Sequence, residues 1–319
     1  TGQIAALETA DLAALTTAQT AALTGAQVAA LTTAQVAALT TAQITALDVA
    51  DLAGMSTVQI VALTGTQAAA LTTAQVAGMG TAQIAALDPA DLAAMTTAQI
   101  VALTTAQAQA LTTAQVAAMA TAQVAAMETA DLVKLTTNQI VALTTAQAQA
   151  LTTAQVANLS TAQIAALETA DLAALSTGQV LALTAAQVAA LTTDQIGKLT
   201  TEQIGALETA DMVALTTAQV RQLTNAQLQK LSVEQLQAME VGDVAALSTA
   251  QVIALTSSQI AALTAAQIAG MGTAQVAAIE AADIPALTGA QLAALTTAQA
   301  RALATDQIAA LTTGQFEQL

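Results

Sequence analysis

An eight-residue repeat runs through the whole chain without insertion or deletion, and it constrains the fold more than any other feature. Its consensus, Thr-Thr-Ala-Gln-Val/Ile-Ala-Ala-Leu, stands unaltered at residues 32–39. The eighth position recurs from residue 7 to residue 319, which gives (319 − 7)/8 + 1 = 40 octads, and it holds 32 Leu, 7 Met and Ile279. The fourth position holds 32 Gln and 8 Asp. We expect residues 1–319 to form one continuous repeat array without loops that could build an active site.

Each octad is predicted to be a short helix. Its apolar positions, such as Val36 and Leu39, are three residues apart and share one helical face. The Thr-x-x-Gln pattern of Thr32 and Gln35 is that of a capping box, which marks the start of a helix. In one long helix, eight residues turn through about 800°, so the apolar stripe would drift by about 80° per octad. We therefore expect separate helices of about five to seven residues, each begun by a Thr cap.

Such short helices are unstable alone, so the predicted fold is an all-α solenoid with one helix per octad. A second period suggests the size of its coil. The eight Asp of the fourth position each follow another acid by three residues, and they recur every five octads except for one step of four octads. From this we predict five octads, or about 40 residues, per coil, with the acids in one column. The acidic pairs are Glu8 and Asp11, Asp48 and Asp51, Asp88 and Asp91, Glu128 and Asp131, Glu168 and Asp171, Glu208 and Asp211, Glu240 and Asp243, and Glu280 and Asp283.

A β-solenoid is the alternative fold. Thr, Val and Ile suit strands, and a short repeat without gaps suits stacked β-coils. Ala at three of the eight consensus positions fits strands poorly. The pattern also lacks the strict alternation of a half-buried strand, which favours the helical solenoid.

Composition bears on function mainly by exclusion. The chain has no His or Cys and only 8% charged residues, so catalysis is not expected and no catalytic, cofactor-binding or metal-binding residue is assigned. A net charge of −16 disfavours nucleic acid as a partner. Thr and Gln interrupt the apolar residues in every octad, so no run has the length of a membrane-spanning helix and membrane insertion is not expected.

Two features leave a binding role open. An acidic column would attract cations weakly, although the motif lacks the Gly turn and the dense oxygen ligands of a calcium loop. Regular Thr pairs on one face could form an array of the kind that ice-binding solenoids need. For both features, helix capping is the simpler explanation.

The Thr-Thr-Ala-Gln-Val-Ala-Ala-Leu motif, repeated through residues 24–47 and 97–127, resembles Ala/Thr/Gln-rich octad arrays of very large bacterial secreted or surface proteins, often labelled adhesin-like. The resemblance covers the whole chain and implies an extracellular or cell-surface location. It brings no haem site, because His, Tyr and Cys are all missing.

Two hypotheses about function follow. The first is a structural rod or filament segment, a spacer, stalk or matrix component, that associates with itself end to end or with other copies. The second is a binding module that recognises a protein, a glycan, ice or a cation through one solenoid face. The variable positions are few, which favours the structural segment.

Overall fold

The computed structural model describes residues 1–319 and is entirely helical, with 39 α-helices, one 3-10 helix and no strand. The β-solenoid alternative is therefore not supported. The chain divides into two compact units, Thr1–Leu159 and Ser160–Leu319, and each is described by itself. That residues 1–319 form one continuous array stays a prediction.

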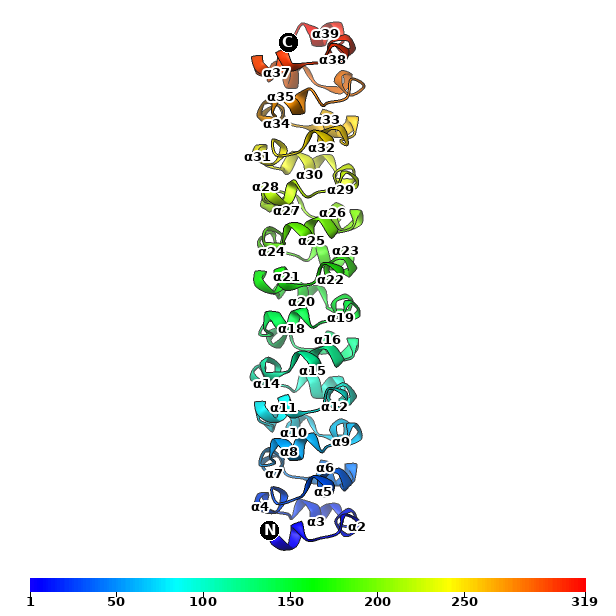
Figure 1. The fold of residues 1–319 in the computed structure, drawn as a ribbon, viewed down its shortest axis with the longest axis vertical. Helices are drawn as coiled ribbons and strands as arrows, with labels where there is room; N and C mark the ends of the chain where they lie inside the picture. The colour runs from blue at the N-terminus through cyan, green and yellow to red at the C-terminus, as the bar shows by residue number, and fades with distance from the viewer. The chain divides into compact units, whose positions relative to one another are not determined.

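The N-terminal unit contains twenty helices, one per octad (Figure 1). They are α1 (Gly2–Ala5), α2 (Thr9–Ala13), α3 (Thr17–Ala21), α4 (Gly25–Val28), α5 (Thr33–Ala38), α6 (Thr41–Ala46), α7 (Val49–Ala53), α8 (Thr57–Val61), α9 (Gly65–Ala70), α10 (Thr73–Gly78), α11 (Thr81–Ala86), α12 (Pro89–Ala94), α13 (Thr97–Val101), α14 (Thr105–Ala110), α15 (Thr113–Ala118), α16 (Thr121–Ala126), α17 (Thr129–Leu132), α18 (Thr137–Val141), α19 (Thr145–Ala150) and α20 (Thr153–Asn158).

The C-terminal unit repeats the arrangement with nineteen α-helices and the 3-10 helix η1. They are α21 (Thr161–Ala166), α22 (Thr169–Ala174), α23 (Thr177–Leu181), α24 (Ala185–Ala190), α25 (Thr193–Lys198), α26 (Thr201–Ala206), α27 (Thr209–Ala214), α28 (Thr217–Val220), α29 (Asn225–Lys230), α30 (Val233–Ala238), α31 (Val241–Val244), α32 (Thr249–Ile253), α33 (Ser257–Ala262), α34 (Ala265–Gly270), α35 (Thr273–Val276), η1 (Ile284–Ala286), α36 (Gly289–Ala293), α37 (Thr297–Ala302), α38 (Thr305–Ala310) and α39 (Thr313–Phe316).

The helices start where the sequence predicts, and at four to six residues they are slightly shorter than expected. In octad 72–79, the side chain of Thr72 accepts the backbone N–H of Gln75, and the amide oxygen of Gln75 accepts the N–H of Thr72. This reciprocal pair is the predicted capping box. The helix ends at Gly78, and the next residue, Met79, is extended with φ −64° and ψ 146°. The following Gly80 is also extended, with φ −72° and ψ 155°, so the corner needs no positive φ.

The two prolines behave differently. Pro89 follows the Asp88 cap at the start of α12, where its missing N–H costs no hydrogen bond. Pro285 sits later in its octad, where the missing donor removes an α-helical bond, and this octad forms the 3-10 helix η1.

The predicted coil of five octads is wrong. Within each unit, the helices that pack against one another are three octads apart, as α12 with α9 and α15. Hydrogen bonds also join octads that are four apart, since Gln75 reaches the carbonyl of Ile44. A coil therefore takes between three and four octads. Each helix lies over the junction of two helices of the preceding coil.

The coil is smaller than predicted because each octad contributes only a small volume of apolar side chains to the interior. Val76 is 0% exposed and Met79 is 4% exposed, and these two positions supply the apolar core of the octad. The Ala residues of positions three and six face solvent, as the exposed Ala74 and Ala77 show. Two medium-sized side chains per octad fill only a narrow interior, and protein cores do not tolerate an empty centre.

The predicted acidic column is absent for the same reason. Five octads correspond to between 5/4 and 5/3 of a coil, so acids that are five octads apart cannot lie above one another. Accordingly, the acidic octad of α7 packs against α4 and α10, and that of α12 packs against α9 and α15. The five-octad period is a period of the sequence and not of the coil.

Two glycines show that side-chain sizes match the packing between helices that are three octads apart. A Cβ atom added to Gly78 would lie 2.3 Å from Cγ1 of Val49, and one added to Gly270 would lie 2.3 Å from Cγ1 of Val241. Both valines replace the consensus Thr at position two of an acidic octad, and both glycines replace the consensus Ala at position seven three octads later. The same pairing of a valine with a glycine three octads later therefore occurs twice in the chain.

We predict that Gly78→Ala destabilises the N-terminal unit by about 1–2 kcal/mol, because overpacking against Val49 outweighs the better helix propensity of alanine. The double variant Val49→Ala/Gly78→Ala should recover that loss. The measurement is thermal unfolding followed by far-UV circular dichroism. Gly242→Ala is the matched control, because its Cβ meets nothing within 4 Å. Equal effects at Gly78 and Gly242 would show that the predicted clash is not real.

Candidate functional site: the glutamine contact and the acidic octads

In most octads, a buried glutamine makes the main polar contact between coils. In the N-terminal unit, Gln75 is 1% exposed, and its Nε2 donates to the carbonyl oxygens of Ile44 at 2.8 Å and Leu47 at 2.9 Å. Its Oε1 accepts the N–H of Thr72 at 2.8 Å. Both amide hydrogens and the amide oxygen are therefore used.

The C-terminal unit contains the same contact. Gln267 donates from Nε2 to the carbonyls of Leu236 at 3.0 Å and Met239 at 2.9 Å, while its Oε1 accepts the N–H of Thr264 at 2.8 Å. The two carbonyls belong to the C-terminal end of α30, where helices leave such groups without an intrahelical donor. One amide thus caps the start of its own helix and the end of a helix in the preceding coil.

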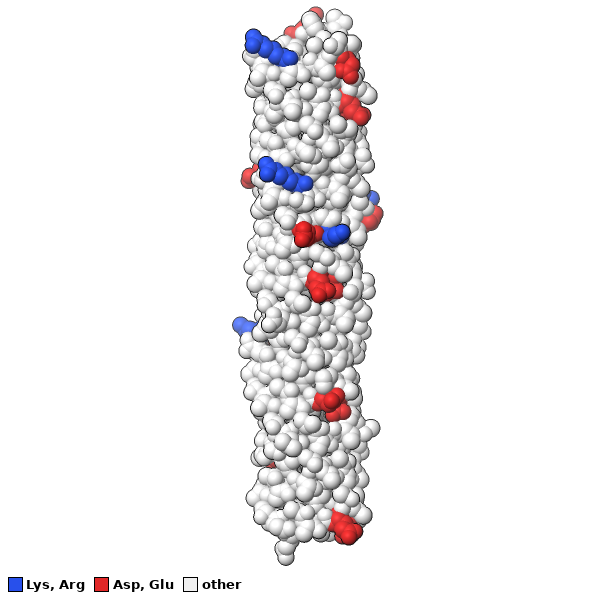
Figure 2. All heavy atoms as spheres, viewed as in Figure 1, with Lys and Arg blue, Asp and Glu red and all other residues white.

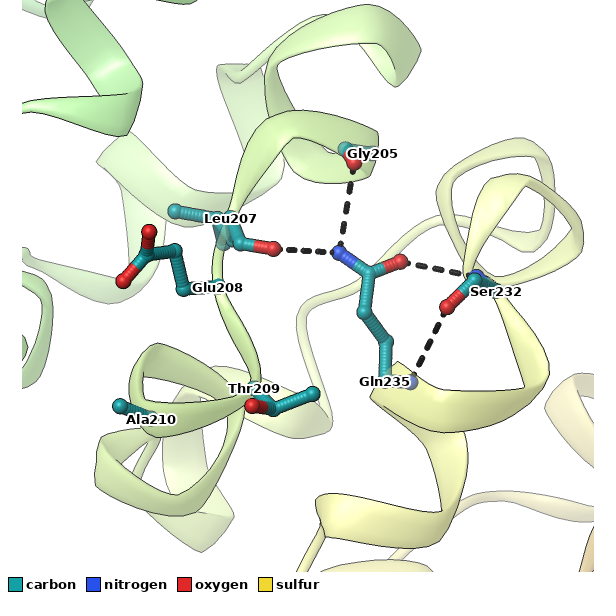
Figure 3. A pocket seen from close by; sticks show the side chains of 7 residues that line it. All are labelled: Gly205, Leu207, Glu208, Thr209, Ala210, Ser232 and Gln235. Atoms are coloured by element: carbon teal, nitrogen blue, oxygen red, sulfur yellow. Dashed lines mark hydrogen bonds between the residues drawn. The ribbon is translucent and has the colours of Figure 1, made fainter.

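An open surface depression, about 520 Å³ in volume, lies beside one of these contacts in the C-terminal unit (Figure 3). In it, Gln235 donates to the carbonyls of Leu207 at 2.7 Å and Gly205 at 3.4 Å. It also exchanges hydrogen bonds with Ser232. The amide that faces the depression is already bound within the protein, so its two N–H groups are not available to a ligand.

A second depression, about 370 Å³ in volume, lies between neighbouring coils of the same unit. It is lined by Thr169, Thr193, Asp194, Gly197, Lys198, Gln222 and Thr224. It therefore contains one acid and one base from α25. Both Asp194 and Lys198 are exposed to solvent.

Charged side chains are sparse in both units. On the face drawn in Figure 2, a few charged groups stand on an otherwise uncharged surface, and an acidic group lies beside a basic one near its middle. No group of three or more acidic side chains converges in the way that a carboxylate metal centre requires. The helices are too short to cross a membrane.

The first acid of the acidic octads caps a helix only when it is aspartate. Oδ1 of Asp48 accepts the N–H of Ala50 at 2.9 Å, and Asp88 does the same for Ala90. The side chains of Glu128 and of the other glutamates that precede a helix make no such bond at their caps. The predicted capping role therefore holds for Asp48 and Asp88.

The second acid replaces the glutamine, and the structure gives it a neighbour that the sequence did not reveal. Oδ1 of Asp243 accepts the hydroxyl of Thr217 at 2.9 Å, and Asp283 accepts the hydroxyl of Ser257. Each hydroxyl lies 26 residues earlier, on the helix three octads back. At the same spacing, Gly25 faces Asp51, whose Oδ1 would lie 3.0 Å from an added Cβ.

Burial raises the pKa of three of these aspartates above the usual value. For Asp91, desolvation is the main cause and the charge of Asp88 adds to it. For Asp211 and Asp243, desolvation again dominates, with hydrogen bonds from the Glu208 backbone and from Thr217 acting in the opposite direction. These carboxylates are therefore less easily ionised in the folded chain than in the unfolded chain.

Comparison with known families identifies the repeat. The ALTTAQ repeat matches eight segments that together span most of the chain: residues 4–41, 44–81, 84–121, 124–161, 164–201, 204–241, 236–273 and 276–313. The chain belongs to the ALTTAQ repeat family. The comparison with curated proteins gave no match.

The ALTTAQ repeats follow the acidic octads. Successive matches begin five octads apart except between residues 204 and 236, where the step is four octads. The acids show the same shorter step between Asp211 and Asp243. The family repeat therefore comprises five octads, whereas the coil contains fewer than four, and the two periods are distinct.

We predict that Gln115→Glu destabilises the chain by about 2–5 kcal/mol at neutral pH, since a carboxylate cannot donate to the carbonyls of Ile84 and Leu87, each 2.8 Å from Nε2. Thermal unfolding by circular dichroism measures the loss. Ala114→Glu is the control, because it adds the same charge one residue away at an exposed position. If both variants lose equal stability, the hydrogen bonds of the glutamine are not the cause.

The aspartate shifts predict a pH dependence with a definite sign. A carboxyl group whose pKa is raised by folding contributes its full stabilisation of the folded chain at pH values below its pKa in the unfolded chain. That contribution is lost as the pH rises through its pKa in the folded chain. As the pH rises from about 3 to about 7.5, the double variant Asp211→Asn/Asp243→Asn should therefore lose less stability than the natural chain.

Glu202→Gln/Glu234→Gln is the matched control for this pH dependence. It also removes two negative charges, but the pKa values of Glu202 and Glu234 are lowered, first of all by hydrogen bonds from their own backbone N–H groups. The control should therefore not flatten the profile. Unfolding midpoints at both pH values, in chelator-containing buffer, compare the two. Identical profiles would mean that total charge, and not burial of the aspartates, sets the pH dependence.

Proposed function

We propose that this ALTTAQ-repeat chain is a structural segment, a spacer, stalk or matrix component, of a bacterial surface or secreted protein. Its tandem short helices are those of a structural repeat protein. The observation that carries the proposal is how the polar groups of the interior are used. The glutamine amides, the strongest hydrogen-bonding side chains of the repeat, join coil to coil and leave little for a ligand.

The surface supports the same proposal. Each octad presents mainly Thr and Ala to solvent, as Thr113 and Ala117 of α15 illustrate. Methyl and hydroxyl groups repeated in this way give few positions at which one partner could be distinguished from another. We propose accordingly that the chain is not an enzyme and that its location is extracellular or at the cell surface, which follows from the resemblance to octad arrays of secreted bacterial proteins.

Self-association is part of this proposal. Each coil joins the preceding one through the same hydrogen bonds from glutamine amides to backbone carbonyls. A second copy of the chain contains the same amide and carbonyl groups, so it could bind through the same hydrogen bonds. Light scattering over a range of protein concentrations tests the association. A particle mass that does not change with concentration would remove self-association from the proposal without affecting the spacer role.

A deletion of one family repeat tests the spacer role. Because the octads on either side of residues 84–123 have the same pattern, removing this segment, which is five octads long, should preserve the coil-to-coil contacts. We expect the helical circular dichroism per residue to stay unchanged. The maximum dimension from small-angle X-ray scattering should fall by about one eighth, as in an array whose repeats contact only their neighbours.

A control deletion removes only residues 84–87, which is half an octad and breaks the register of the glutamine contacts. It should lower the unfolding midpoint much more than the deletion of the whole family repeat. Equal losses for the two deletions, or an unchanged maximum dimension after the longer one, would contradict a modular spacer.

A further inference from the structure

The second depression of the C-terminal unit lies where the chain departs from its octad consensus. Four of the seven residues that line it replace the consensus alanine of positions three, six and seven: Asp194, Gly197, Lys198 and Gln222. The other three keep the consensus threonine: Thr169, Thr193 and Thr224. A consensus octad presents only methyl groups at positions three, six and seven. The charges of this depression are therefore a local feature and not a property of the repeat.

Glycine at position six helps to create the space. Only two octads have a glycine there, Gly197 and Gly205, and each of them lines one of the two depressions described above. Gly197 belongs to α25, which packs against α28, and a Cβ atom added to it would lie 3.5 Å from the carbonyl oxygen of Gln222. The alanine that most octads have at this position would be in ordinary van der Waals contact there. Its absence leaves space between the two coils.

Several polar groups of the second depression are not engaged within the chain. The side chains of Asp194, Lys198 and Gln222 are exposed to solvent, and no hydrogen bond or ion pair joins them to another group of the protein. The hydroxyl of Thr193 is free as well, since the cap of α25 is formed by Thr192. In the first depression, by contrast, the glutamine amide is bound to two backbone carbonyls. The second depression therefore offers donors and acceptors to a ligand.

The charges of the second depression favour a neutral ligand. Asp194 repels an anion and Lys198 repels a cation, because both charges line the same small space. A hydroxyl group suits both of them, since it donates to the carboxylate and accepts from the ammonium group. The amide of Gln222 can also donate and accept. A ligand with several hydroxyl groups would use all of these side chains, and the threonine methyl groups would contact its C–H groups.

We propose that the second depression binds one neutral pyranose unit of a glycan, with Asp194, Lys198, Gln222 and Thr193 as hydrogen-bonding partners. Its volume of about 370 Å³ lies within the range of small-molecule pockets, about 300–1,000 Å³. Because the depression is open to solvent, the rest of a sugar chain can extend away from the protein. The site does not depend on the spacer role.

Saturation-transfer NMR of the full chain with the methyl pyranosides of glucose, galactose, mannose and N-acetylglucosamine tests the proposal. We expect saturable binding of at least one of them with a Kd of about 1–10 mM, as for a small ligand that is not deeply buried. Asp194→Ala and Gln222→Ala restore the consensus residue, so both variants should fold. Asp194→Ala should weaken binding by about tenfold, the loss expected for a hydrogen bond to a charged group. Gly197→Ala should weaken binding as well, because the added methyl group occupies part of the space.

Asp306→Ala is the matched control. It removes the same side chain from the same position of another octad in this unit, and Asp306 does not line the depression. It should bind the pyranoside as the natural chain does. Absence of binding for all four pyranosides would overturn the proposal, and so would equal affinities of the natural chain and Asp194→Ala. Sodium acetate is tested in parallel, because binding of acetate in place of every pyranoside would show an anion site at Lys198 and would also overturn it.

Discussion

The fold depends on the buried glutamine amide that most octads contain. Helices of four to six residues have more unpaired backbone groups at their ends than paired ones inside, and in isolation they would not persist. The amide of Gln75 satisfies the cap of its own helix and two carbonyls at the end of α6. Secondary structure and coil stacking are therefore stabilised by the same side chain.

This double use explains why the fourth position is so restricted. Glutamate has the same shape but cannot donate, and asparagine is shorter by one methylene than the distance requires. Threonine at the first position is less restricted, since Gly80 and Ala120 take its place while their backbone N–H groups still donate to the glutamine oxygen at 2.8 Å. The amide contributes more to these caps than the hydroxyl does.

Some of the acidic octads have a particular neighbour on the helix three octads earlier. The residue 26 positions before Asp243 and Asp283, Thr217 or Ser257, provides a hydroxyl, and the one before Asp51, Gly25, lacks a side chain, whereas the one before Asp211 is Ala185. Such contacts with a neighbouring coil are visible only once the coil is known. The family repeat of five octads and the coil of fewer than four also bring each acidic octad to a new side of its unit, which distributes negative charge instead of concentrating it.

The sequence by itself determined the local structure. Thr-x-x-Gln fixed where helices begin, the apolar spacing fixed which face is buried, and the absence of gaps fixed a repetitive stack. Tertiary structure alone decided the coil, because the reach of Gln75 to Ile44 and the fit of Gly78 against Val49 depend on distances across coils. A sequence period of five octads could not reveal them, since the number of octads per coil is set by how much volume two core side chains fill.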